Sequence, residues 1–110
     1  IEQVLVNLLR NALDATKAVP EPEIEIILVS GETATLAVRD NGVGIEDLES
    51  LFEPFYTTKP PGDGVGLGLA ISSGIVTELG GRLTARNGER GGAVFEMQLP
   101  VLNAQTEAAE

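Results

Sequence analysis

The sequence contains no cysteine, no histidine and no tryptophan. Without cysteine the chain forms neither disulfides nor thiolate sites, which agrees with a reducing compartment. Without histidine it also lacks the commonest general base and, with cysteine, the usual zinc ligands. Any chemistry must therefore use carboxylates, amides, hydroxyls, lysine, backbone groups or a hard metal ion.

Basic residues are scarce as well. The chain has 7 lysines and arginines against 17 acidic residues, which gives a formal net charge of −10. That charge repels nucleic acids and anionic lipids, so we expect neither a nucleic-acid partner nor direct membrane contact. No apolar run approaches the roughly 20 residues of a membrane-spanning helix. The 110 residues, 43% hydrophobic and 22% charged, have the composition of one globular domain.

The first part of the chain predicts a helix followed by a hairpin. Residues 1–17 place apolar side chains at helical spacing, and Pro20 and Pro22 end the pattern. Because the pattern begins without an N-capping residue, we expect the chain to be a segment cut from a longer protein. The β-branched runs at residues 24–30 and 33–40 predict two paired strands.

The second part repeats the change from helix to strand. Residues 46–52 predict a short helix, and residues 67–79 predict a longer one that the glycine pair 80–81 ends. Residues 82–88 and 92–100 predict a second hairpin. The element order α-β-β-α-α-β-β predicts an α+β fold, with helices covering one face of a mixed, mostly antiparallel sheet.

Two asparagines lie one turn apart in the first predicted helix. At about 100° per residue, Asn7 and Asn11 are within roughly 40° of each other at the border of the apolar stripe, which Asp14 shares. Asparagine is a mediocre helix former, so the pair needs a reason. Its amide oxygens could ligate Mg²⁺ while phosphates supply further oxygens. The alternative is two ordinary amides that bond within the protein or to water.

The second predicted strand ends in a carboxylate and glycines. Leu36 and Val38 point to one face of the strand, and Asp40 shares their parity. A carboxylate on the apolar face needs donors, and the amino group of a nucleotide base would serve. Gly42 and Gly44 then let the backbone approach a ligand closely. The alternative is that residues 40–42 simply form a turn.

A glycine-rich loop leads into the helix predicted at residues 67–79. Gly64, Gly66 and Gly68 alternate up to its first turn, where unpaired N–H groups and a partial positive charge attract phosphate. The spacing fits neither the dinucleotide-binding fingerprint nor the P-loop. This loop alone is a weak signal. Its occurrence after the asparagine pair and Asp40, in that order, is a much stronger one.

Together these segments resemble the catalytic, ATP-binding domain of sensor histidine kinases. That superfamily also includes the ATPase regions of type II topoisomerases, heat-shock chaperones of the ninety-kilodalton class and mismatch-repair clamps. "NLLRNALDA" resembles the asparagine box, "DNGVGI" the first glycine box, "LFEPFYTTK" the phenylalanine box and "GVGLGLAIS" the second glycine box. The resemblance covers residues 1–100 and leaves residues 101–110 as an acidic tail. It is nearest to nitrogen-regulation, oxygen-sensing and dicarboxylate-transport sensors.

The resemblance implies a two-layer α/β sandwich that binds ATP or ADP with Mg²⁺. It implies that Asn11 ligates the metal with support from Asn7. Asp40 would bind the adenine amino group, and Lys59 would reach phosphate. Residues 56–65 would form a mobile lid. The other nucleotide contacts that it implies are Asp14, Gly42, Gly44, Ile45, Phe55, Thr58, Gly64, Val65, Gly66, Leu67, Gly68 and Leu69. Relatives often carry lysine in place of Asp14 and threonine in place of Val65 and Ala93, so these positions depart from the pattern.

The implied activity is transfer of the γ-phosphoryl group to a histidine on a separate dimerisation domain. The chain would be the cytoplasmic catalytic part of a bacterial two-component sensor, monomeric in isolation and acting on a response regulator only indirectly. Hydrolytic relatives carry a glutamate general base where Asn7 stands, and an amide cannot accept a proton. Two alternatives are an ATP-binding regulatory module without kinase activity and a clamp-type ATPase.

Overall fold

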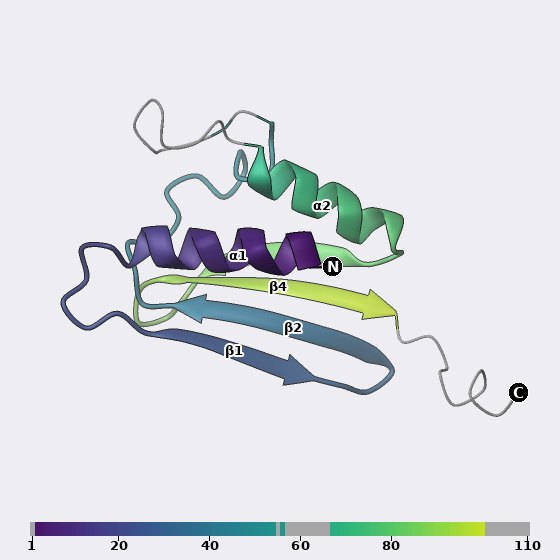
Figure 1. Ribbon diagram of the computed structural model, residues 1–110, viewed down its shortest axis with the longest axis horizontal. Coiled ribbons are helices and arrows are strands. Elements are labelled where there is room, and N and C mark those ends of the chain that lie inside the picture. The colour runs from purple at the N-terminus through teal and green to yellow at the C-terminus, as the bar shows by residue number, and fades with distance from the viewer. Residues whose placement is uncertain (1, 55, 57–66, 101–110) are drawn as a thin grey trace, which may run out of the picture.

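The computed structural model describes residues 2–54, 56 and 67–100. Figure 1 shows two layers, with both helices on the same face of a four-stranded sheet. No helix in these ranges is long and apolar enough to span a bilayer. The elements, in chain order, are α1 (Glu2–Ala15), β1 (Ile24–Val29), β2 (Thr33–Asp40), α2 (Gly68–Glu78), β3 (Arg82–Asn87) and β4 (Ala93–Pro100).

The sheet has the strand order β1-β2-β4-β3, and each of these neighbouring pairs is antiparallel. Two hairpins build it, and the edge of one pairs with the edge of the other. Val38 of β2 therefore lies between Ile26 of β1 and Phe95 of β4. The predicted α+β class, both hairpins and both longer helices are confirmed.

The core lies between the helices and the middle of the sheet. The apolar stripe of α1 faces β2, because residues three and four apart share one side of a helix. The side chains of the strands alternate, so every second residue of β2 and β4 points toward α1 and α2. The buried cluster consists of Val4, Leu8, Ala12, Val38, Val76, Leu83, Ala93, Phe95 and Met97.

The edge strand β1 is much less buried than its neighbours. Its register with β2 places Ile26 and Leu28 on the face that the helices cover elsewhere. Both side chains remain exposed, at 50% and 69% of their area. The core is therefore centred on β2, β4 and β3, under the two helices.

The short helix predicted at residues 46–52 was wrong, because that segment forms turns. The Asp47 carboxylate accepts from the backbone N–H groups of Glu49 (3.1 Å) and Ser50 (3.2 Å), which caps a single turn. Pro54 follows closely, and proline both lacks an N–H and disfavours helical backbone in the residue before it. A segment this short forms too few hydrogen bonds to offset helix nucleation.

The ends of the two longer helices lie close to the predicted ones. α1 ends at Ala15 rather than near residue 17, with Thr16 Oγ1 donating to Ala12 O at 2.9 Å. α2 ends at Glu78, and Gly80 then adopts a φ of +83°. Glycine accepts this left-handed backbone without strain, so the glycine stop is confirmed.

Candidate functional site

Asp40 ends β2, one residue beyond the pair formed by Arg39 and Val94 of β4, and is only 2% exposed. Its Oδ1 accepts hydrogen bonds from the backbone N–H groups of Gly42 (2.8 Å) and Ala93 (3.3 Å). The described residues provide no hydrogen bond to Oδ2. An ionised carboxylate has lone pairs to spare on both oxygens. Asp40 is thus fixed by the backbone through one oxygen and can accept a donor through the other.

The glycine-rich segment after Asp40 packs against the C-terminal end of α1. Val43 N donates to Ala15 O at 3.2 Å. A Cβ on Gly42 would collide with that same carbonyl oxygen. Gly44 has a φ of +82°, a conformation that costs other residues about 1–2 kcal/mol. Both glycines are therefore required by the backbone path itself.

The hairpin turn between β3 and β4 contacts the other side of this segment. Gly92 has a φ of +74°, and a Cβ there would collide with the backbone oxygen of Asp40. Gly92 does not stand out in the sequence, because a glycine in a hairpin turn is fully explained by the turn. Only the fold reveals that its missing side chain also lets the turn reach Asp40.

Asn87, the last residue of β3, was also missed. Its Oδ1 accepts from Ile45 N at 2.7 Å, and its Nδ2 donates to Ile45 O at 3.1 Å. Asn41 makes a similar pair, accepting from Glu23 N at 2.8 Å and donating to Glu21 O at 2.9 Å. The Asn41 amide therefore joins the end of β2 to the segment before β1, and the Asn87 amide joins the end of β3 to Ile45.

Asn7 joins α1 to the start of α2. Its Nδ2 donates to Gly68 O (3.1 Å) and to Ser72 Oγ (2.9 Å), while its Oδ1 accepts from Gln3 Nε2 (3.1 Å). A carbonyl oxygen can only accept, so Gly68 O fixes which side of the Asn7 amide faces α2. Ser72 is fully buried. It was not singled out in the sequence, although a polar residue inside an apolar helix is a signal that could have found it.

Asn11 lies between Asn7 and the end of α1 that contacts Gly42. Its side chain is half-buried, and no hydrogen bond of its amide occurs within the described ranges. The rise of about 1.5 Å per residue separates Asn7 from Ala15 by roughly 12 Å along the helix. Asp14 is half-buried on the same side of the helix by periodicity.

The start of α2 contains three of the predicted nucleotide contacts, Leu67, Gly68 and Leu69. A Cβ on Gly68 would lie 3.8 Å from Asn7 Cγ, an ordinary contact. Leu67 is the N-capping residue and makes no side-chain cap. Leu69, like Ile45, packs against the core cluster.

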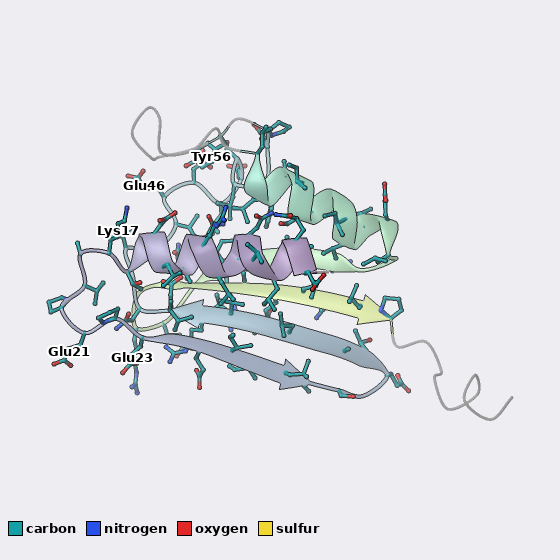
Figure 2. All side chains as sticks on the ribbon, viewed as in Figure 1. Lys17, Glu21, Glu23, Glu46 and Tyr56 are labelled. Carbon is teal, nitrogen blue, oxygen red and sulfur yellow. The ribbon has the colours of Figure 1, made fainter. Side chains whose placement is uncertain are left out.

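Several predicted residues lie outside the described ranges. Figure 2 shows Glu46 and Tyr56 on the connection between β2 and α2, on the helix-covered side of the sheet. Lys17 lies beyond the end of α1. Of the predicted lid, only Tyr56 is described. The predicted site residues that lie outside the described ranges are Phe55, Thr58, Lys59, Gly64, Val65 and Gly66.

The Asp40 carboxylate lies at one end of the site and the start of α2 lies at the other end. Between them lies the amide of Asn11, a side chain whose oxygen can ligate a metal ion. Residues 1–103 match the family described as histidine kinase-, DNA gyrase B-, and HSP90-like ATPase. The chain belongs to this family. The described site therefore lies in an ATPase domain of the histidine-kinase type.

The chain is similar in sequence to sensor proteins and in structure to the catalytic domain of a histidine kinase. The chain is 46% identical to the two-component sensor PprA of Pseudomonas aeruginosa, over 98% of the chain and 12% of PprA. It is 43% identical to the C4-dicarboxylate transport sensor protein DctB of the same organism, over 90% of the chain and 17% of DctB. The chain thus spans less than a fifth of these two relatives. The solved catalytic domain of the histidine kinase ThkA is 36% identical, with a TM-score of 0.77, over 91% of the chain and 66% of that structure.

Proposed function

We propose that this domain binds Mg-ATP and is the catalytic half of a sensor histidine kinase, in the cytoplasmic part of a bacterial two-component system. It transfers the γ-phosphoryl group to a histidine on a separate dimerisation domain, from which a response regulator receives it. The observation that carries the proposal is Asp40, which is 2% exposed and which the described backbone holds through one carboxylate oxygen, Oδ1.

Base recognition follows from the chemistry of Asp40. Its Oδ1 is occupied by the N–H groups of Gly42 and Ala93, so the carboxylate is held in one orientation. The other oxygen can accept from the exocyclic amino group of adenine. Guanine carries an acceptor oxygen at the corresponding position, and two acceptors repel. The domain therefore prefers ATP to GTP.

The residues present fit a magnesium ion. Mg²⁺ prefers oxygen ligands and commonly shares them with substrate phosphates. Asn11 would hold it, because its half-buried amide makes no hydrogen bond within the described part of the chain. Asn7 supports it, since its Oδ1 accepts one hydrogen bond, from Gln3, and keeps a second lone pair. When bound, the ion neutralises negative charge on the phosphates.

The acceptor is an imidazole rather than water. In the transfer step an imidazole nitrogen bonds to the γ-phosphorus while the bond to the β-phosphate oxygen breaks, and ADP leaves with that electron pair. A neutral imidazole is itself nucleophilic. Water would need a general base, and the Asn7 amide cannot accept a proton. Its Nδ2 is also committed to Gly68 and Ser72.

The test mixes the chain with γ-labelled ATP and the histidine-bearing helical domain of its parent kinase. We expect acid-labile label on the helical domain and almost no ATP hydrolysis by the chain alone. Asn11→Ala should abolish transfer, because it removes a metal ligand. Thr84→Ala, an exposed position on β3, is the control and should transfer normally.

Other outcomes of the same assay would contradict the proposal. Rapid ATP turnover by the chain alone, without labelling of the helical domain, would favour a clamp-type ATPase. Nucleotide binding with neither turnover nor transfer would favour a regulatory module.

A further inference from the structure

Asn87 and Ile45 lie 42 residues apart in sequence, and two hydrogen bonds join the Asn87 side chain to the Ile45 backbone. The amide accepts from Ile45 N and donates to Ile45 O, as a peptide group of a neighbouring strand would. Asparagine can make this pair because its amide has both an acceptor and a donor. Alanine can make neither bond, and aspartate can only accept.

The contact between Asn87 and the glycine-rich segment extends to Gly44. The φ of +82° at Gly44 turns the backbone, and a Cβ there would approach Asn87 Oδ1 to 3.0 Å. The side chain of Asn87 therefore lies directly against Gly44 as well as Ile45. Because Asn87 ends β3, its own position is fixed by the pairing of Asn87 with Ala93.

The segment from Gly42 to Ile45 is thus held from two directions. On one side, Val43 N donates to Ala15 O at the end of α1. On the other side stand Asn87 and the turn that brings Gly92 against Asp40. From Glu46 to Pro54 the described chain forms turns, so Asn87 holds the last residue of this segment before those turns begin.

We infer that Asn87 is a positioning residue for the nucleotide base. It acts through Ile45 and Gly44, which it holds at a fixed distance from the Asp40 carboxylate. Without it the backbone N–H and C=O of Ile45 would bond to water, and the segment would have to be ordered before the adenine amino group could reach the Asp40 carboxylate. Ordering a loop on binding lowers affinity. The inference rests on the proposed nucleotide site and assigns that site a residue on the opposite hairpin.

The test compares ADP with inosine diphosphate, which carries an oxygen where adenine has its amino group. Asn87→Asp keeps the shape and the acceptor but has no donor for Ile45 O and places a negative charge beside it. Asn87→Ala removes both bonds, and Thr84→Ala is the control on the same strand. Calorimetry with Mg²⁺ gives the affinity for each nucleotide, and thermal unfolding of the nucleotide-free chain checks that each variant folds.

We expect both Asn87 variants to bind ADP about tenfold more weakly, the scale of one to two lost hydrogen bonds. Inosine diphosphate does not use the Asp40 contact, so its affinity should change by less than about twofold. Thr84→Ala should leave both affinities unchanged. Wild-type ADP affinity in Asn87→Asp, or an equal loss for both nucleotides, would overturn the inference alone. Failure of the unmodified chain to bind ADP would overturn the proposed function and this inference with it.

Discussion

The two ends of the candidate nucleotide site differ in how closely their glycines are packed. At the base end, a Cβ on Gly42 or Gly92 would collide with the backbone oxygen of Ala15 or Asp40. At the phosphate end, the nearest described atoms to a Cβ on Gly68 are those of the Asn7 amide, at distances of 3.8 to 4.0 Å. The described part of the chain therefore excludes side chains at Gly42 and Gly92 but makes no close contact with one at Gly68.

This difference indicates that the glycines at the two ends of the site have different roles. Gly42 and Gly92 serve the fold, because they let α1 and the β3–β4 turn contact the segment around Asp40. Gly68 is not required by packing, and glycine is a poor residue for a helix. It stands in the first turn of α2, where backbone N–H groups have no partner within the helix. We propose that its missing side chain leaves those groups open to the phosphates of the nucleotide.

The largest expected effect is loss of stability at the base end. Gly92→Ala should lower the free energy of unfolding by about 3 kcal/mol or more, because a backbone collision adds to a φ that disfavours alanine. Urea unfolding measures this. Gly31→Ala is the control, since nothing lies within 4 Å of a Cβ at that turn position. Equal stability of the two variants would mean that the turn does not press against Asp40.

The next largest expected effect is a loss of nucleotide affinity in a variant that still folds. Asp40→Asn can still accept from Gly42 N and Ala93 N through its amide oxygen. Its amino group would then face the adenine amino group, which also donates. ADP binding should weaken by about 1–3 kcal/mol, the scale of a hydrogen bond to a charged group. Calorimetry that gives an unchanged affinity would remove Asp40 from the site.

A smaller effect is expected where α1 meets α2. Ser72→Ala removes one of the two acceptors of Asn7 Nδ2, while Gly68 O keeps the other. We expect a loss of about 1 kcal/mol in the free energy of unfolding. Ser73→Ala, the neighbouring position, changes the helix propensity equally and makes no hydrogen bond within the described residues. If Ser72→Ala is as stable as Ser73→Ala, the amide bridge contributes nothing to the helix packing.

Local patterns predicted most of the fold because they depend on neighbouring residues only. The apolar stripe of residues 1–17 and the alternation in residues 33–40 predict which side of each element is buried. Val4, Leu8, Ala12 and Val38 are buried as expected, whereas Leu13 is 60% exposed and Ala37 is buried on the other face of β2. The segment at residues 46–52 was wrong, because its apolar residues fit a helix while Asp47 and Pro54 limit it to turns. In a short segment, single residues such as these decide whether a helix or a turn forms.

The site was harder to predict because its contacts join distant segments. Asp40 and Asn7 could be singled out from strand parity and helix periodicity, although their roles stay predictions. Asn87, Gly92 and Ser72 act only through their positions in the assembled fold. An asparagine at a strand end or a glycine in a turn is explained locally, so nothing in the sequence pointed from Asn87 to Ile45.

The smallest effect tests the comparison between the two ends most directly. Gly68→Ala and Gly74→Ala both replace glycine in α2, and nothing lies within 4 Å of a Cβ at Gly74. Each should leave stability unchanged or raise it by up to about 1 kcal/mol, because alanine has the higher helix propensity. Only Gly68→Ala should weaken ATP binding, by about 1 kcal/mol, because its methyl group would hinder the approach of a phosphate to the first turn. Urea unfolding and calorimetry with Mg-ATP measure the two quantities on the same variants. Equal ATP affinity in both would show that Gly68 serves neither the fold nor the ligand, and the phosphate contact would then have to lie elsewhere.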